Sequence, residues 1–286
     1  MQFFTPLLSA MAFAALTAGA AVAGPLADKL AAKEPLRIGF ANEAPFSFAS
    51  PDGSIKGSDI VVLEKVLGAM GAGEFDAVLM PFGSLIPALK SKRIDIIASG
   101  LYIRPDRCTQ VSFAEPVFAV GDAIVVPAGN PKGLHSLEDI AKDPSLKLGY
   151  TTGAAGLMEH AWAAGVQKEQ TSALADGASL IAALKAGRMD AFLYPSLSAT
   201  ALLAGANDPA VERASPFTQT MINGKADLGV GSFAMRLEEA DFVAEFNKGL
   251  TALVQSADYL PLIEEFGFSA DDIPAAGLTT AALCAG

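Results

Sequence analysis

The side chains best suited to binding chemistry follow a short apolar run, Asp95 to Ala98, which predicts a buried strand. Tyr102, Arg104 and Arg107 come shortly after it. Ligand contacts in α/β folds gather at the carboxyl ends of parallel strands. A tyrosine ring can stack on a cation, and an arginine fork can hold a carboxylate through two hydrogen bonds. We therefore predict a small-molecule site here, with solvated surface arginines as the alternative.

One sequence unit occurs twice. Leu85 to Ala98 reads L-I-P-A-L-K-S-K-R-I-D-I-I-A, and Leu180 to Leu193 reads L-I-A-A-L-K-A-G-R-M-D-A-F-L. Each copy predicts an amphipathic helix, a tight turn and a buried strand that opens with Asp. A unit used twice indicates two similar α/β lobes rather than a long repeat array. Clefts between such lobes are preferred ligand sites.

Composition limits the class of protein. The chain has 286 residues, of which 51% are hydrophobic, and this suffices for two folded cores. The formal net charge is -11. Because no basic stripe offsets this charge, we expect neither a nucleic-acid partner nor binding to an anionic membrane surface.

The first residues have the pattern of an export signal. An apolar, Ala-rich run from Leu7 to Val22 precedes the first charged side chain, Asp28, and Ala21-Val22-Ala23 fits a small-x-small cleavage site. We expect residues 1–23 to be a signal peptide, cut before Gly24, and the mature protein to be periplasmic. A membrane anchor is the alternative, which the short run disfavours.

The chain contains two cysteines, Cys108 and Cys284. In an oxidising compartment an even pair predicts a disulfide bond. This bond would fix the C-terminal tail beside the Arg107 turn. Two buried free thiols are the alternative.

Two extended apolar runs predict where the chain passes between the lobes. Val120 to Val126 ends in a Gly- and Pro-rich break, and Leu228 to Met235 marks the return. We expect lobe 1 to comprise residues 24–126 and 229–286, lobe 2 residues 127–228, and the two crossings to form a hinge.

In lobe 2, a predicted strand is followed by the small-residue loop Thr151 to Gly156 and then by a helix. This arrangement offers backbone N–H groups to an anion, or forms a tight loop without a ligand.

Motifs of several enzyme classes are missing from the sequence. His135 and His160 have no metal-like spacing, and we expect His160 to be solvated. The sequence has no G-x-S-x-G motif and no phosphate-binding loop. We expect no metal and no cofactor.

The chain resembles the periplasmic solute-binding proteins of ABC importers, amino-acid-binding type (family 3). The resemblance rests on P-L-R-I-G-F-A-N-E-A-P-F, G-S-D-I-V-V-L-E-K-V-L, the first copy of the repeated unit with S-G after it, R-P-D-R, F-A-E-P-V and A-G-R-M-D-A-F. It implies a two-lobed type II binding-protein fold with a two-strand hinge, a permease partner and no catalysis. It also implies that Arg107 grips a carboxylate while the loop of Gly153, Ala154 and Ala155 adds backbone donors. We expect a monomer.

One position departs from relatives that bind α-amino acids. Those proteins carry an Asp after the second-lobe strand to pair with the ammonium group, whereas this chain has Pro195 there. An α-amino acid would leave its ammonium poorly paired, at a cost in a closed cleft.

The strings A-N-E-A-P-F and S-G-L-Y-I-R-P-D-R-C resemble the ectoine- and hydroxyectoine-binding branch. That resemblance implies an aromatic box of Phe46, Phe82 and Tyr102, with Glu43 accepting the ring N–H groups and Arg107 binding the carboxylate. The alternative for the two phenylalanines is core packing. An amino acid or related zwitterion is the second ligand hypothesis. A third hypothesis is an enzyme similar to cyclohexadienyl dehydratase, with Glu43 as general acid.

Overall fold

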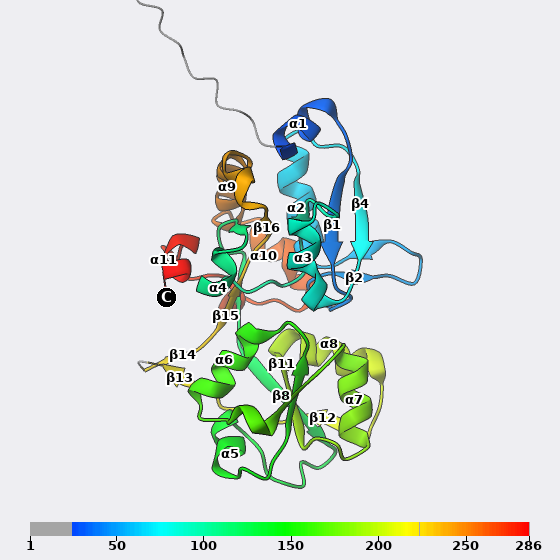
Figure 1. Cartoon of the computed structure of the whole chain (residues 1–286), viewed down its shortest axis with the longest axis vertical. Coiled ribbons are helices and arrows are strands. Elements are labelled where there is room, and N and C mark those ends of the chain that lie inside the picture. Colours follow the sequence, from blue (N-terminus) through cyan, green and yellow to red (C-terminus); the bar gives the residue numbers. More distant parts are fainter. Residues whose placement is uncertain (1–24, 223, 286) are drawn as a thin grey trace, which may run out of the picture.

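The computed structural model describes residues 25–222 and 224–285. The predicted signal peptide and its cleavage site lie outside these residues. Figure 1 shows two lobes, one above the other, with the chain passing between them. None of the helices within the described ranges is both long enough and apolar enough to span a bilayer.

The upper lobe in Figure 1 is built from the two ends of the chain. Its N-terminal elements are α1 (Pro25–Ala32), β1 (Leu36–Phe40), β2 (Phe48–Ala49), β3 (Ile55–Lys56), α2 (Ser58–Ala69), β4 (Phe75–Leu79), α3 (Leu85–Lys90), β5 (Ile96–Ile97), α4 (Pro105–Cys108) and β6 (Ser112–Phe113). Its C-terminal elements are β16 (Ala234–Met235), α9 (Ala240–Val254), α10 (Tyr259–Ile263) and α11 (Thr280–Ala285).

The lower lobe is one continuous segment. Its elements are β8 (Asp122–Pro127), α5 (Leu137–Lys142), β9 (Leu148–Thr151), α6 (Ala155–Ala163), β10 (Thr171–Leu174), α7 (Gly177–Lys185), β11 (Ala191–Pro195), α8 (Ser196–Ala206), β12 (Val211–Arg213), β13 (Met221–Ile222) and β14 (Lys225–Ala226). Strands β7 (Phe118–Val120) and β15 (Gly229–Gly231) connect the lobes.

The two main sheets repeat one arrangement. The upper sheet has the order β4-β1-β5-β16-β6 and the lower sheet β10-β9-β11-β8-β12. In each sheet the first three strands are parallel and the strands that follow are antiparallel to their neighbours. The observed α/β architecture confirms the predicted fold class.

The two copies of the repeated unit occupy equivalent places. Each forms a helix, a turn and the third strand of its sheet, α3 to β5 and α7 to β11. The repeated aspartate does the same work in both. Asp95 accepts a hydrogen bond from the Arg37 backbone N–H at 3.1 Å, and Asp190 accepts one from Lys147 N–H at 2.7 Å. The carboxylate thus fixes the start of the neighbouring strand, which explains why Asp opens both strands.

Two short strands carry the chain between the lobes. β7 and β15 pair antiparallel, with Phe118 opposite Gly231 and Val120 opposite Gly229. We predicted the first crossing near Val126, but Asp122–Pro127 is a strand of the lower sheet. The sheet membership therefore moves the crossing to residues 118–121. An apolar run alone does not distinguish a crossing strand from a core strand.

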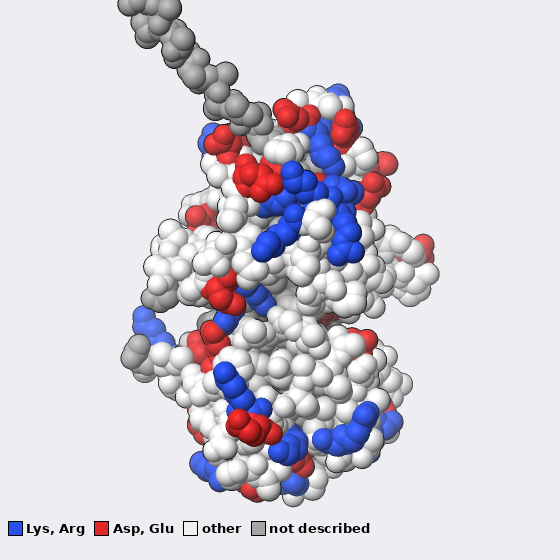
Figure 2. Space-filling model, in the orientation of Figure 1, with Lys and Arg blue, Asp and Glu red and all other residues white. Residues whose placement is uncertain are grey.

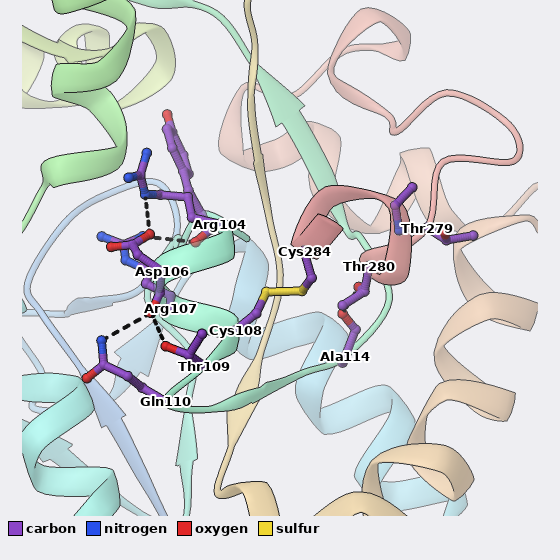
Figure 3. The surroundings of a disulfide bond; sticks show 12 residues. Arg104, Asp106, Arg107, Cys108, Thr109, Gln110, Ala114, Thr279, Thr280 and Cys284 are labelled. Carbon is purple, nitrogen blue, oxygen red and sulfur yellow. Dashed lines mark hydrogen bonds and ion pairs between the residues drawn. A yellow bond between two sulfur atoms is a disulfide. The ribbon is translucent and has the colours of Figure 1, made fainter. Parts of the chain in front are cut away.

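The C-terminal helices return to the upper lobe. α9 packs on α2 through an apolar face that includes Phe242, Phe246 and Leu250, spaced as an amphipathic helix requires. α11 then lies beside α4 (Figure 3). The Cys108–Cys284 disulfide joins these two helices, which confirms the predicted bond.

The disulfide should contribute strongly to stability, because it closes a loop with a sequence separation of 176 residues. We expect Cys284→Ser to lower the free energy of unfolding by about 3–5 kcal/mol in the chain-entropy account. Chemical denaturation of the oxidised wild type and of the variant measures this difference. The Cys108→Ser/Cys284→Ser double variant should match the single variant, and equal midpoints for all three proteins would contradict the prediction.

Candidate functional site

A cavity lies between the lobes, at the waist visible in Figure 2. Residues of both lobes contribute to it. Its lining residues are Glu43, Phe82, Gly100, Tyr102, Arg107, Thr151, Ala154, Gly156, Leu157, Tyr194 and Pro195. A wider hollow adjoins it and shares Glu43, Phe82, Thr151 and Tyr194 with it.

Arg107 is the cation of the cavity. Its side chain is buried, with 5% exposed, and it donates at 2.9 Å to two carbonyl oxygens, those of Tyr102 and Gly153. Within the described part of the chain these carbonyls are its partners, and no carboxylate forms an ion pair with it. Burial, reinforced by the charge of Arg104, lowers the pKa of Arg107 to about 10, so the group stays charged at neutral pH. A buried, unpaired guanidinium is a ready partner for an anionic ligand.

The two lobes are closed on the cavity. The hydrogen bond from Arg107 to Gly153 crosses between them, and so does the ion pair of Arg104 with Glu159. Gly153 has φ +91°, and a Cβ there would lie 2.6 Å from the Cα of Gly83 on the opposite lobe. Glycines on both lobes therefore permit the backbones to approach.

Tyr102 lies between the hinge and the lower lobe. Its hydroxyl is buried without a hydrogen-bond partner among the described residues. A Cβ on Gly229 would lie 2.0 Å from the Tyr102 Cζ atom, and one on Gly156 would lie 3.4 Å from Cδ2. Both glycines thus leave room for the ring. Phe82 completes this side, with its ring centroid 5.8 Å from the Arg107 Cζ atom.

Glu43 is the acid of the cavity, as the lining residues of the described chain include no other carboxylate. Its backbone is fixed by a short bridge to Ser47. Burial raises the pKa of Glu43 to about 7, and the Ser198 hydroxyl from the lower lobe opposes this shift in part. The group can therefore change its charge near neutral pH. Geometrically, the Ser198 hydroxyl is buried with no hydrogen-bond partner among the described residues, so we treat its effect on Glu43 as weak.

Asp59 holds the turn before Tyr102. Asp59 lies in the first turn of α2 and accepts a hydrogen bond from Gly100 N–H at 2.8 Å. Gly100 has φ +59°, in the region that favours glycine. Burial raises the pKa of Asp59 to about 7. This carboxyl group thus fixes the position of Gly100, which lines the cavity.

The loop before α6 reaches the cavity through one of its three candidate residues. Ala154 lines the cavity, and the first N–H groups of α6 have no partner within the helix. Ala155 is not a lining residue, and Gly153 presents its carbonyl oxygen to Arg107. The geometry thus gives Gly153 a role as acceptor, whereas the sequence suggested a donor.

Phe46 is not a lining residue of the cavity. It is 1% exposed, and its ring centroid lies 4.6 Å from that of Phe118 and 5.9 Å from that of Phe268. Hydrogen bonds from the start of α2 to the carbonyls of Pro45 and Phe46 turn this segment inward. Phe46 therefore packs in the core, which was the alternative to its expected place in an aromatic box.

Some lining residues were not predicted to bind. Thr151 has a buried hydroxyl with no partner among the described residues, and the Tyr194 ring lies beside it. Tyr194 precedes Pro195, the position at which relatives that bind α-amino acids carry an Asp. This neighbouring departure was the sequence signal that could have identified Tyr194 as a lining residue. Leu157 gave no signal, because a leucine on a helix is ordinarily a core residue.

The family model for bacterial extracellular solute-binding proteins, family 3, matches residues 36–269. A probable amino-acid ABC transporter periplasmic-binding protein of Sinorhizobium fredii is 33% identical over 260 residues, covering 90% of this chain and 85% of the relative. The lysine/arginine/ornithine-binding periplasmic protein of Escherichia coli is 27% identical, covering 82% and 87%. The crystal structure of EhuB in complex with hydroxyectoine superposes with a TM-score of 0.78 at 32% identity, covering 90% of this chain and 96% of that one.

The close approach of Gly229 to Tyr102 predicts that a single methyl group will disturb the site. We expect Gly229→Ala to lower the free energy of unfolding by about 1–3 kcal/mol, because the ring must move to admit a Cβ. Gly73→Ala is the matched control, since Gly73 lies outside the helices and strands and a Cβ there meets nothing within 4 Å. Thermal unfolding of both variants measures the contrast, and equal melting temperatures would count against the packing described here.

Proposed function

The chain belongs to family 3 of the bacterial extracellular solute-binding proteins, and from this premise we propose that it delivers ectoine, hydroxyectoine or a similar zwitterionic compatible solute to an ABC permease. The solute would occupy the cavity between the closed lobes. The chain would act outside the cytoplasm, as the names of its relatives indicate for those proteins. In this proposal the protein binds and releases its solute unchanged.

Arg107 carries the proposal. It is a buried guanidinium in an interlobe cavity, and the described residues give it carbonyl partners but no carboxylate. A solute carboxylate would complete its hydrogen bonding, with the N-terminal N–H groups of α6 as further donors. The ligand class therefore includes an anion.

The other side chains that line the cavity favour a diffuse cation. Glu43 supplies one negative charge, and the rings of Phe82 and Tyr102 supply faces on which a delocalised amidinium can stack. Pro195 lines the cavity at the place where an acid would pair with an α-ammonium group. The observation that supports ectoine over an α-amino acid is this combination of one acid, aromatic rings and a proline.

The rival ligands come from the relatives. The Escherichia coli relative is named for lysine, arginine and ornithine, so an amino acid is the second candidate. An enzyme similar to cyclohexadienyl dehydratase would instead turn over prephenate or arogenate, with Glu43 as the acid. Incubation of the purified protein with these two compounds separates catalysis from binding.

We predict that ectoine and hydroxyectoine bind more tightly than glutamine, arginine and proline, as measured by calorimetry on one preparation. Arg107→Ala should weaken ectoine binding by about 2–5 kcal/mol, because a buried carboxylate loses its partner. The affinity of Arg107→Lys for ectoine should lie between that of the wild type and that of Arg107→Ala, since lysine keeps the positive charge but lacks the forked guanidinium. Arg93→Ala, at an exposed position, is the control. Tight binding of one of the three amino acids without ectoine would refute the ligand class and leave the family membership intact.

The raised pKa of Glu43 predicts a pH dependence. Above about pH 7 the carboxylate is ionised and complements a cationic ring; below it, binding must displace a proton, so its contribution to affinity is lost as pH falls. The ratio of the ectoine Kd of Glu43→Gln to that of the wild type should therefore be large at pH 8.5 and approach one at pH 5.5. A ratio that does not change with pH would argue against an ionised Glu43 contacting the solute.

A further inference from the structure

His160 joins the lower lobe to both crossings of the hinge. We expected it to be solvated, but its exposed fraction is 7%. Its Nδ1 atom lies 2.8 Å from Asp122 Oδ2, at the start of β8, just past the first crossing. Its Nε2 atom lies 3.6 Å from Asp227 Oδ2, two residues before the return strand β15. One imidazole thus contacts the chain next to each crossing.

The same ring supports the cavity. The His160 and Tyr102 rings are stacked, with centroids 6.4 Å apart and an interplanar angle of 25°. Tyr102 belongs to the upper lobe and lines the cavity, whereas His160 lies on α6 of the lower lobe. This ring pair therefore crosses between the lobes, while the contact of His160 with Asp122 stays at the lower lobe. Opening of the cleft would separate the rings and keep the Asp122 contact.

The surroundings of His160 favour its charged form. Asp122 accepts the Nδ1–H, so a neutral ring would point its Nε2 lone pair at the Asp227 carboxylate. A second proton turns that repulsion into an ion pair. Burial lowers the pKa of His160, but the hydrogen bond and charge of Asp122 and the charge of Asp227 raise it by more.

Three further groups face this cluster. Arg104 opposes the protonation of His160, and its own charge is paired with Glu159, which lies next to His160 on α6. The phenol of Tyr102 stays neutral, because burial first and the charge of Asp122 second raise its pKa well above the ordinary value. Burial likewise raises the pKa of Asp122, while its bond with His160 opposes that shift. We take the pair as charged, since two carboxylates face one imidazole.

We propose that His160 is a positioning residue for solute binding: as an imidazolium held by Asp122 and Asp227, it stacks on Tyr102 and stabilises the closed lobes. The inference rests on the proposed function, because it concerns the affinity for the solute. A cation beside a tyrosine ring is attracted to it; at a centroid distance of 6.4 Å this attraction is modest, and it exists only while the lobes are closed. Closure therefore favours the protonated ring, and by linkage protonation favours closure.

The sign of the effect is opposite to that of Glu43. The folded-state pKa of His160 is raised, so its contribution is fully present below about pH 6.5, the ordinary value, and is lost as pH rises through the raised value. The affinity of the wild type combines both groups. The ratio of Kd values between a variant and the wild type, taken at each pH, isolates one group.

The test is the ectoine Kd of the wild type, His160→Gln and His135→Gln between pH 5.5 and 8.5. For His160→Gln, the ratio of its Kd to that of the wild type should be roughly three- to tenfold at pH 5.5 and decrease as the pH rises. His135→Gln is the matched control with a ratio near one throughout, because His135 lies away from the hinge, next to Pro216. A His160→Gln ratio that is the same at every pH would reduce His160 to a packing role and overturn the inference.

Two measurements keep the test independent of folding and of the ligand. The chain contains two histidines, so His135→Gln leaves one imidazole signal to titrate by NMR. We expect the pKa of His160 to rise when ectoine binds and to fall in Asp227→Asn, which removes one carboxylate.

If ectoine does not bind, the proposed ligand fails, and small-angle scattering of the ligand-free protein decides this inference. A smaller radius of gyration at pH 5.5 than at pH 8.5 in the wild type, absent in His160→Gln, supports it, and equal radii refute it.

Discussion

The site depends on a guanidinium buried between two lobes without a carboxylate partner. Arg107 donates to the carbonyl of Tyr102 on its own lobe and to that of Gly153 on the other. A buried charge that makes only neutral hydrogen bonds is costly to the folded chain, and an anionic ligand relieves this cost. Because one of the two carbonyls belongs to the lower lobe, the same side chain would contact both the proposed solute and the closed lower lobe. In the proposed function, recognition and closure are therefore coupled at this residue.

Close approach at a few glycines makes this arrangement possible. The ring of Tyr102 fits because Gly229 on the hinge strand and Gly156 on α6 carry no side chain. Behind it, the rings of Phe118 and Phe46 form a packed column that continues into the upper-lobe core, and Phe118 is itself part of hinge strand β7. The ligand contact, the hinge and the core are thus mechanically connected. A change in any one of them should reach the other two.

The charges around the cavity divide into supporting and responsive groups. Asp95 is held ionised: burial would raise its pKa, but hydrogen bonds from Arg37 and Lys29 lower it well below the usual range. It fixes a strand and has no reason to respond to pH. Glu43 and His160, in contrast, have raised pKa values for different reasons, because one is a desolvated acid and the other an imidazole between two carboxylates. The site can therefore respond to pH in a way that the supporting framework does not.

The sequence by itself determined the two-lobed α/β fold, the disulfide and part of the candidate site. The repeated unit predicted two equivalent sheets because helix period, turn and strand are local patterns. The strand end at Ala98 predicted Tyr102 and Arg107 as candidates, the resemblance added Glu43 and Phe82, and all four line the interlobe cavity. Only the tertiary structure decided where Phe46 and His160 lie. A turn phenylalanine can face the cleft or the core, and hydrogen bonds to α2 turned Phe46 inward. The partners of His160 are 38 and 67 residues away in sequence, at Asp122 and Asp227, so no local pattern could reveal that it is buried at the hinge.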